Sequence, residues 1–313
     1  LTIDEVAALY DMLMERGGPY NIQLSGGEPT MRDDLPEIVR LGRERGFSFF
    51  QLNTNGLRLA SEPDYAAALR EAGVSCAFLQ FDGLRPASYE ALRGRDISAE
   101  KLRAIDNCAA AGLPVVLVPT LAPGVNEDEI GGILRFALAR GKALRGVHFQ
   151  PVSYFGRCAL PEPVRRLTIP RVLREIEAQT GGLLRRADFG GGGAESPWCS
   201  FHASYRRLPG GGLKALPRRE GACCRAGEAR DFVAGRWGFG SEPREDEDGF
   251  DRFMREAVEN TFTVSGMAFM DADSLELDRL RRCHISEADA CRGMVPFCAY
   301  NLTARDGRAL YRR

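Results

Sequence analysis

The first 180 residues alternate between strand-like and helix-like segments, and this alternation is the feature that most constrains the fold. Each short apolar run is followed by a longer segment with apolar residues at helical spacing, which is typical of a parallel sheet with helices outside it. Five such strands suit a sector of a (β/α) barrel better than a closed eight-stranded barrel. We therefore predict an α/β fold containing a partial TIM-type (β/α) barrel. The predicted strands are 21–25, 47–53, 76–82, 115–120 and 147–150, and the predicted helices are 3–16, 34–45, 64–72, 99–111, 128–140 and 169–179.

The sequence changes character after about residue 181. It becomes glycine-rich and irregular, with one run from Gly190 to Gly193, and it carries six of the nine cysteines of the chain. A length of 313 residues suits one barrel-like domain with a smaller appendage. We therefore predict two domains, a partial barrel at 1–180 and an irregular cysteine-rich domain at 181–313.

Charge and hydropathy exclude several classes of partner. The chain has 42 Lys and Arg residues against 43 Asp and Glu residues, so no basic excess predicts binding to nucleic acid or to an anionic membrane. It shows neither an apolar run of about 18 residues nor a signal peptide pattern, which predicts no transmembrane segment and a cytoplasmic location. An odd number of cysteines in such a chain favours metal ligation or burial over a disulfide framework.

Polar or glycine-rich sequence follows every predicted strand. In β/α barrels the ligand site is built at the C-terminal ends of the strands, so these residues are expected to share one rim. The candidate ligand-binding residues are Ser25, Gly26, Gly27, Glu28 and Pro29 after the first strand, Asn53, Thr54 and Asn55 at the second, Asp82 at the third, Thr120 at the fourth and Gln150 at the fifth.

The segment from Ser25 to Thr30 has the most specific chemistry of these. Two adjacent glycines let a ligand approach the backbone closely, and the carboxylate that follows can hold a cationic group. Pro29 then fixes the turn. The alternative is an ordinary strand-to-helix turn, and the Asn55-Gly56 dipeptide has the same alternative.

The Gly-Gly-Glu-Pro segment resembles a motif of the radical S-adenosylmethionine (SAM) superfamily. In that family the motif lies at the end of the second strand and contacts the amino group of SAM. The segment 53–56 is similar to the end of that family's third strand, and Asp82 is similar to the end of its fourth. The resemblance implies that SAM lies across the strand ends, with Glu28 on its ammonium group. It also implies that Asn53, Asn55 and Asp82 lie near the polar groups of SAM.

A narrower resemblance covers nearly the whole chain. It rests on 23–38, 51–56 and 150–157, and on the tail segments 269–271, 277–279, 282–283 and 296–301. These are similar to the tetraether lipid synthase-like branch and to the radical SAM (seleno)proteins called TrsS. The branch implies extra iron centres in the C-terminal domain and, in its lipid synthases, carbon–carbon bond formation between lipid chains.

One family motif is missing from the chain. Radical SAM enzymes hold a [4Fe–4S] cluster with a Cys-x-x-x-Cys-x-x-Cys motif after their first strand, and no cysteine trio in this sequence has that spacing. Because the sequence also starts at Leu1 within a helical pattern, we expect a truncated chain, and we hold a defective relative as the alternative. A start after an in-frame selenocysteine codon would also explain the first residue, given the family. In either case we expect the chain alone not to cleave SAM.

The C-terminal cysteines are a second chemical signal. Thiolates bind iron well, and four of them from separated segments can hold a cluster. Their spacing matches no simple ferredoxin or zinc pattern, so free or buried thiols are the alternative interpretation. The candidate ligands of an auxiliary iron–sulfur or iron centre are Cys199, Cys223, Cys224, Cys283, Cys291 and Cys298.

The resemblance implies an enzyme that uses SAM and a [4Fe–4S] cluster to form a 5′-deoxyadenosyl radical, which abstracts hydrogen from an unactivated carbon. It implies a reductant such as ferredoxin or flavodoxin, and a small molecule or a lipid as substrate. One alternative is a radical SAM maturase that modifies a peptide. Another is a non-catalytic scaffold or redox module that uses only the C-terminal iron site.

Overall fold

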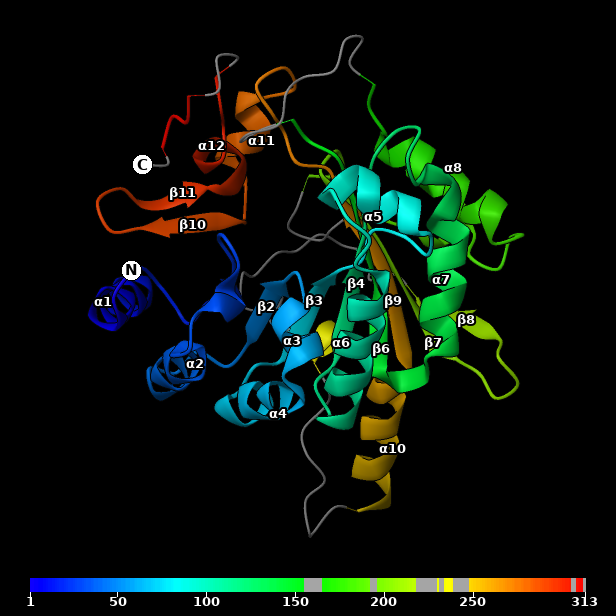
Figure 1. Cartoon of the computed structure of the whole chain (residues 1–313), viewed down its shortest axis with the longest axis horizontal. Helices are drawn as coiled ribbons and strands as arrows, with labels where there is room; N and C mark the ends of the chain where they lie inside the picture. The colour runs from blue at the N-terminus through cyan, green and yellow to red at the C-terminus, as the bar shows by residue number, and fades with distance from the viewer. Residues whose placement is uncertain are drawn as a thin grey trace.

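The computed structural model describes residues 1–154, 165–191, 196–217, 230, 234–238, 248–304 and 308–311. These residues form a nine-stranded sheet in the order β1-β2-β3-β4-β6-β9-β7-β8, with β5 paired to β6 (Figure 1). All neighbours from β1 to β9 are parallel, whereas β7 and β8 are antiparallel. The strands are β1 (Ile22–Leu24), β2 (Phe50–Thr54), β3 (Cys76–Gln80), β4 (Val115–Val118), β5 (Thr120–Leu121), β6 (Leu144–Pro151), β7 (Ser200–Arg207), β8 (Leu213–Ala215) and β9 (Thr261–Met267).

Helices cover one face of this sheet, where α2, α4, α6 and α7 lie in sequence order across it (Figure 1). The six predicted helices are confirmed, each within two residues at its start and its end. The helices are α1 (Ile3–Glu15), α2 (Leu35–Glu44), α3 (Leu57–Ser61), α4 (Pro63–Ala72), α5 (Pro86–Arg93), α6 (Ser98–Ala110), α7 (Ile130–Ala139), α8 (Ile169–Gln179), α10 (Gly249–Glu259), α11 (Leu277–Arg281) and α12 (Phe297–Tyr300), with 3-10 turns at Pro29–Met31, Glu127–Glu129, Gly141–Ala143 and Arg186–Asp188.

The main core lies between the sheet and these helices. The parallel strands point Leu52, Leu79, Leu117, Val147 and Val264 into it, and none of these side chains is more than 1% exposed. Burying one such side chain stabilises the fold by roughly 2 kcal/mol, so five aligned strands anchor the whole sheet. The predicted α/β fold with a parallel sheet is confirmed.

The sheet continues across the boundary that the sequence predicts at residue 180. β9 pairs in parallel with β6, and β7 pairs with β9 in antiparallel register from Ser200↔Met267 to Arg206↔Thr261. These strands lie in the part of the chain expected to be irregular. They do not read as apolar runs, because polar residues such as Thr263 and Ser265 alternate with Phe262 and Val264 along β9.

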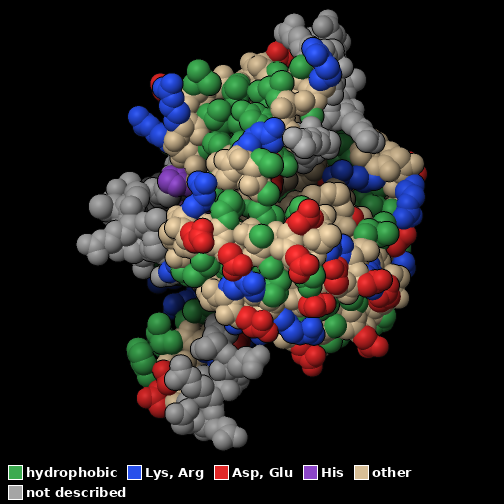
Figure 2. Space-filling view, turned by 90° about the vertical axis from the view of Figure 1, so that its left-hand side faces the viewer, with side chains coloured by type: hydrophobic (Ala, Val, Ile, Leu, Met, Phe, Trp, Pro, Cys, Tyr) green, Lys and Arg blue, Asp and Glu red, His purple; other side chains and the backbone are tan. Residues whose placement is uncertain are grey.

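A small C-terminal unit lies beside the carboxyl ends of the parallel strands. It contains α11, the hairpin of β10 (Ser286–Asp289) and β11 (Gly293–Pro296), and α12 (Figure 1). The hairpin contacts α1, and the Phe297 ring packs on Phe269, just after β9, at 4.6 Å between centroids. Figure 2 shows this side of the molecule, with hydrophobic side chains gathered near the top of the view and charged ones over its middle.

No described helix is both long enough and apolar enough to cross a membrane.

Candidate functional site

The loop after β1 leaves open space at the rim of the sheet. Gly26 has a φ of +102°, a conformation that favours glycine, and Ser25, Gly26 and Gly27 are exposed. A Cβ atom added at Gly26 or Gly27 would meet nothing within 4 Å. The backbone of these two glycines is therefore accessible to a ligand.

The Glu28 carboxylate is bound by its own chain. Oε1 accepts hydrogen bonds from Thr30 N (3.1 Å), Thr30 Oγ1 (2.6 Å) and Thr54 Oγ1 (2.6 Å). Oε2 accepts the Asn55 N–H at 2.6 Å. Glu28 thus ties the loop after β1 to the end of β2. A carboxylate offers about four acceptor sites, so little capacity is left for the SAM ammonium that the sequence resemblance assigns to it.

The end of β2 is a tight turn at 53–57. Thr54 Oγ1 accepts from Gly56 N at 3.0 Å, and Asn55 Oδ1 accepts from Leu57 N at 2.9 Å, at the start of α3. Asn53 is half-buried, and its Oδ1 accepts a hydrogen bond from the side-chain Nε2 of Gln51 at 2.7 Å. The side chains of Thr54 and Asn55 therefore build the turn, while Asn53 lies on the face of the sheet opposite to Leu52.

Asp82 follows β3 and is 0% exposed. It forms a two-pronged ion pair with Arg93, at 2.7 and 3.0 Å, and Oδ1 also accepts the Thr120 N–H at 3.1 Å. A direct contact between the Asp82 side chain and SAM polar groups is therefore not what this geometry favours. The Arg93 side chain, 28% exposed, lies above it and also donates to Thr120 Oγ1 at 3.1 Å.

Thr120 and Gln150 are neighbours in the pairing of β5 with β6, and both are half-buried. Beneath them Asn126, completely buried, donates hydrogen bonds to the backbone oxygens of Asp82 (2.6 Å) and Thr120 (2.8 Å). Two strand ends are therefore joined by one amide group.

Three charged residues of this rim, one exposed and two buried, carry no motif and were missed by the sequence analysis. Exposed Arg93 ends α5, buried Lys101 lies in α6, and buried Glu129 directly precedes α7. Glu129 accepts from Leu84 N at 2.6 Å and Arg85 N at 3.1 Å, which fixes the loop after Asp82. The recurrence of charged residues on helix faces turned toward the strand ends is the one signal that could have marked them.

Comparison with known proteins identifies the N-terminal part of the chain. The family model for the radical SAM superfamily matches residues 1–137. The 7,8-dihydro-6-hydroxymethylpterin dimethyltransferase of Methanocaldococcus jannaschii is 45% identical over 170 residues, which cover 54% of this chain and 33% of that protein. The GTP 3′,8-cyclase of Rhodopirellula baltica is 32% identical over 155 residues, covering 49% of this chain and 42% of that protein.

This region belongs to the radical SAM superfamily. The chain spans between a third and a half of the length of the curated relatives that it matches. Among solved structures, a domain of pyruvate-formate lyase-activating enzyme from Bacteroides vulgatus gives a TM-score of 0.42 at 14% identity, covering 52% of this chain and 94% of that one.

The face of the sheet opposite to the helices has an apolar floor and a polar upper layer. Phe78 and Val116 form the floor with Trp237, whose ring meets Phe78 edge-on at 5.4 Å between centroids. Higher on the strands, His148 Nδ1 lies 2.7 Å from Ser265 Oγ. Burial lowers the pKa of His148 to about 4, so its imidazole is neutral at physiological pH.

Three of the candidate metal-binding cysteines lie near one another at the rim. Cys298 Sγ accepts from Met270 N at 3.3 Å, and Cys199 Sγ accepts from Arg279 Nη2 at 3.0 Å. The pKa of Cys298 is raised to about 11, mainly by burial. The Met270 N–H opposes this rise, and the nearby charges of Cys283 and Cys199 add to it.

These cysteines do not form a complete metal site among the described residues. In that part of the chain, no three His, Cys, Asp or Glu side chains lie close enough together to hold a metal ion. Cys291 is exposed in the turn of the β10–β11 hairpin. Cys283 and Cys298 flank the other end of the hairpin, and its four-residue strands are roughly 10 Å long. Cys223 and Cys224 lie outside the described residues.

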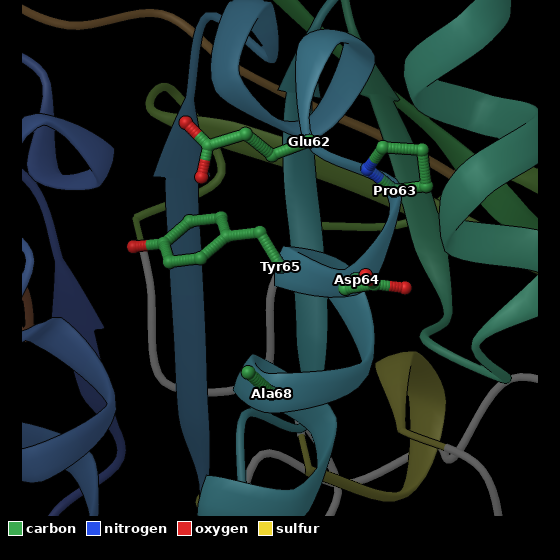
Figure 3. A pocket seen from close by; sticks show the side chains of 5 residues that line it. All are labelled: Glu62, Pro63, Asp64, Tyr65 and Ala68. Atoms are coloured by element: carbon green, nitrogen blue, oxygen red, sulfur yellow. The ribbon is translucent and has the colours of Figure 1, made fainter.

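A surface hollow of about 420 Å³ lies away from this rim (Figure 3). It is lined by consecutive turns at the start of α4, and in Figure 3 Tyr65 and Glu62 point to one side of the helix while Asp64 points to the other. Arg58 stacks on the Tyr65 ring at 4.1 Å. This contact between Arg58 and Tyr65 serves the packing of α3 against α4, so we assign no ligand to the hollow.

Proposed function

We propose that this chain carries the SAM-binding rim of a radical SAM enzyme. The observation that carries the proposal is the open space over the backbone of Gly26 and Gly27, beside a turn held in place by Glu28. When SAM and a reduced [4Fe–4S] cluster are bound, they supply a 5′-deoxyadenosyl radical that abstracts hydrogen from an unactivated carbon. The sequence contains no Cys-x-x-x-Cys-x-x-Cys motif, so we assign no step to a cluster held by these residues.

The residues of the chain bind and orient SAM in this proposal. The Gly26 and Gly27 backbone provides close-range hydrogen-bonding groups, and Glu28 acts chiefly by fixing Asn55. Arg93 is the partly exposed cation of the rim, so it is suited to an anionic group such as the SAM carboxylate. Asp82 orients Arg93 from below.

Gly27→Val tests this site. Gly27 has no φ in the left-handed region and no atom within 4 Å of an added Cβ, so the variant is expected to fold with unchanged thermal stability. Its side chain would fill the ligand space, and we expect SAM affinity, measured by anaerobic isothermal titration, to fall by at least about tenfold. Gly249→Val, at an equally open position on α10, is the control. Equal SAM affinity in both variants would refute the site.

The nature of the substrate is a second proposal. The lipid suggested by the tetraether lipid synthase-like and TrsS resemblance competes with a polar heterocycle. The polar upper layer on the face of the sheet opposite to the helices contains His148 and Gln150. It favours the heterocycle, since a lipid chain would meet few apolar groups there. The relatives named for action on a pterin and on GTP support the same choice. A reductant such as ferredoxin or flavodoxin remains part of the proposal, as does a peptide substrate as the alternative.

An auxiliary iron centre is the third part of the proposal. Cys199, Cys283 and Cys298 would supply three thiolates, with Cys223 or Cys224 completing the set. Anaerobic iron reconstitution should give iron-dependent absorption that Cys283→Ala and Cys298→Ala abolish and Cys291→Ala preserves. Absorption without SAM binding would instead favour the non-catalytic iron scaffold.

A further inference from the structure

Lysine is rare in this chain, and one of its lysines is buried beneath the rim. Three of the 42 Lys and Arg residues are lysines. Lys142 and Lys214 are exposed, whereas Lys101, in α6, is 0% exposed. Burying an ammonium costs several kcal/mol unless partners offset it, so the position needs a reason. A compact ammonium also fits where the larger planar guanidinium of arginine does not.

The partner of Lys101 is the turn at the end of β2. Its Nζ donates a hydrogen bond to the backbone oxygen of Asn55. The N–H of the same residue is held by Glu28 Oε2 at 2.6 Å. Both backbone polar groups of Asn55 are therefore bound by side chains of opposite charge, one from the loop after β1 and one from α6. Charged hydrogen bonds of this kind are about twice as strong as neutral ones.

The charged groups around Lys101 come from two strand ends and two helices. Burial lowers its pKa to about 8; the carboxylates of Asp82, Glu28 and Glu100 oppose that shift, and Arg93 adds to it. Two of these carboxylates, Glu28 and Asp82, follow β1 and β3. Lys101 thus lies between the groups that order the rim, although it has no exposed surface with which to touch a ligand.

We infer that Lys101 is a positioning residue of the SAM site: it fixes Asn55, and through Asn55 the end of β2, from beneath. This inference rests on the proposed SAM site for its functional meaning. It predicts that the ammonium form holds the turn, and that the hold weakens when the proton is lost.

The test follows the backbone amides of Asn55, Gly56 and Leu57 by ¹⁵N NMR of the full chain as pH is raised. In the wild-type protein these signals should shift with a midpoint of about 8. Lys101→Met should abolish that transition, and Lys142→Met, which removes an exposed ammonium, should retain it. SAM affinity at pH 7 should fall roughly tenfold in Lys101→Met and stay unchanged in Lys142→Met.

Turn amides that do not titrate in the wild-type protein, or that titrate equally in Lys101→Met, would overturn the inference. So would unchanged SAM affinity in a folded Lys101→Met variant. If Lys101→Met does not fold, the wild-type titration alone decides. If the wild-type chain binds no SAM, the proposed SAM site fails, and the amide titration still decides whether Lys101 holds the turn.

Discussion

Glu28 and Asp82 show how single carboxylates can serve a site without facing the ligand. Each lies at a strand end, and each accepts hydrogen bonds from backbone or side-chain groups of the neighbouring strand end. Strand ends held in this way keep a fixed orientation, so ligand binding at the rim needs little rearrangement. The exposed groups of the rim, which are the backbone of Gly26 and Gly27 and the side chain of Arg93, are then the ones left to contact the ligand.

His148 predicts a pH dependence of stability. Its pKa is lowered by burial to about 4, against 6.5 for an ordinary histidine, so the unfolded chain binds the proton more readily than the folded chain. The contribution of the neutral imidazole is therefore fully present above pH 6.5 and is lost as pH falls toward 4, by on the order of 3 kcal/mol. His148→Gln, which cannot titrate, should lose less stability over this window in chemical denaturation. Parallel pH profiles for the two proteins would contradict this prediction.

At the scale of elements, the turn between β2 and α3 depends on close packing. Gly56 has a φ of +76°, and an added Cβ would lie 2.3 Å from Leu79 Cδ1. Gly56→Ala should therefore combine left-handed strain of about 1 kcal/mol with overpacking of about 1–3 kcal/mol. Thermal or urea unfolding would measure this loss.

Gly112→Ala is the matched control for that measurement. Gly112 also has a positive φ, +64°, but an added Cβ there would meet nothing within 4 Å. It should show the strain alone. Equal destabilisation of the two variants would mean that Leu79 moves aside at no cost.

The sequence predicted the elements well where hydrophobic periodicity was strong. The helix at 169–179 is confirmed at both ends, and the apolar strand 115–120 is confirmed as β4 with β5. The short helices α3 and α5 were missed, because five or eight residues give too little periodicity. β9 was missed because polar and apolar residues alternate along it, whereas a strand inside a parallel sheet is expected to be an apolar run. Lys101 could not be found, since its role depends on which carbonyl the fold brings above it.

At the scale of the whole molecule, residues 1–180 should not behave as a domain. Without β9, β6 would become an edge strand with unpaired backbone groups from Gly146 to Phe149. We expect a 1–180 fragment to aggregate and to lack a cooperative unfolding transition, in contrast to the full chain. A monomeric fragment with a sharp transition in circular dichroism would show that the parallel sheet is complete without β9.

The place of β9 also bears on how the chain folds during synthesis. The strand that pairs with β6 begins at Thr261, more than one hundred residues after β6 ends at Pro151. The last parallel strand is therefore delivered by the ribosome long after its neighbour, and closing so long a loop is slow. Until then the unpaired edge of β6 is exposed on the nascent chain, where it is available to a chaperone that binds strand edges.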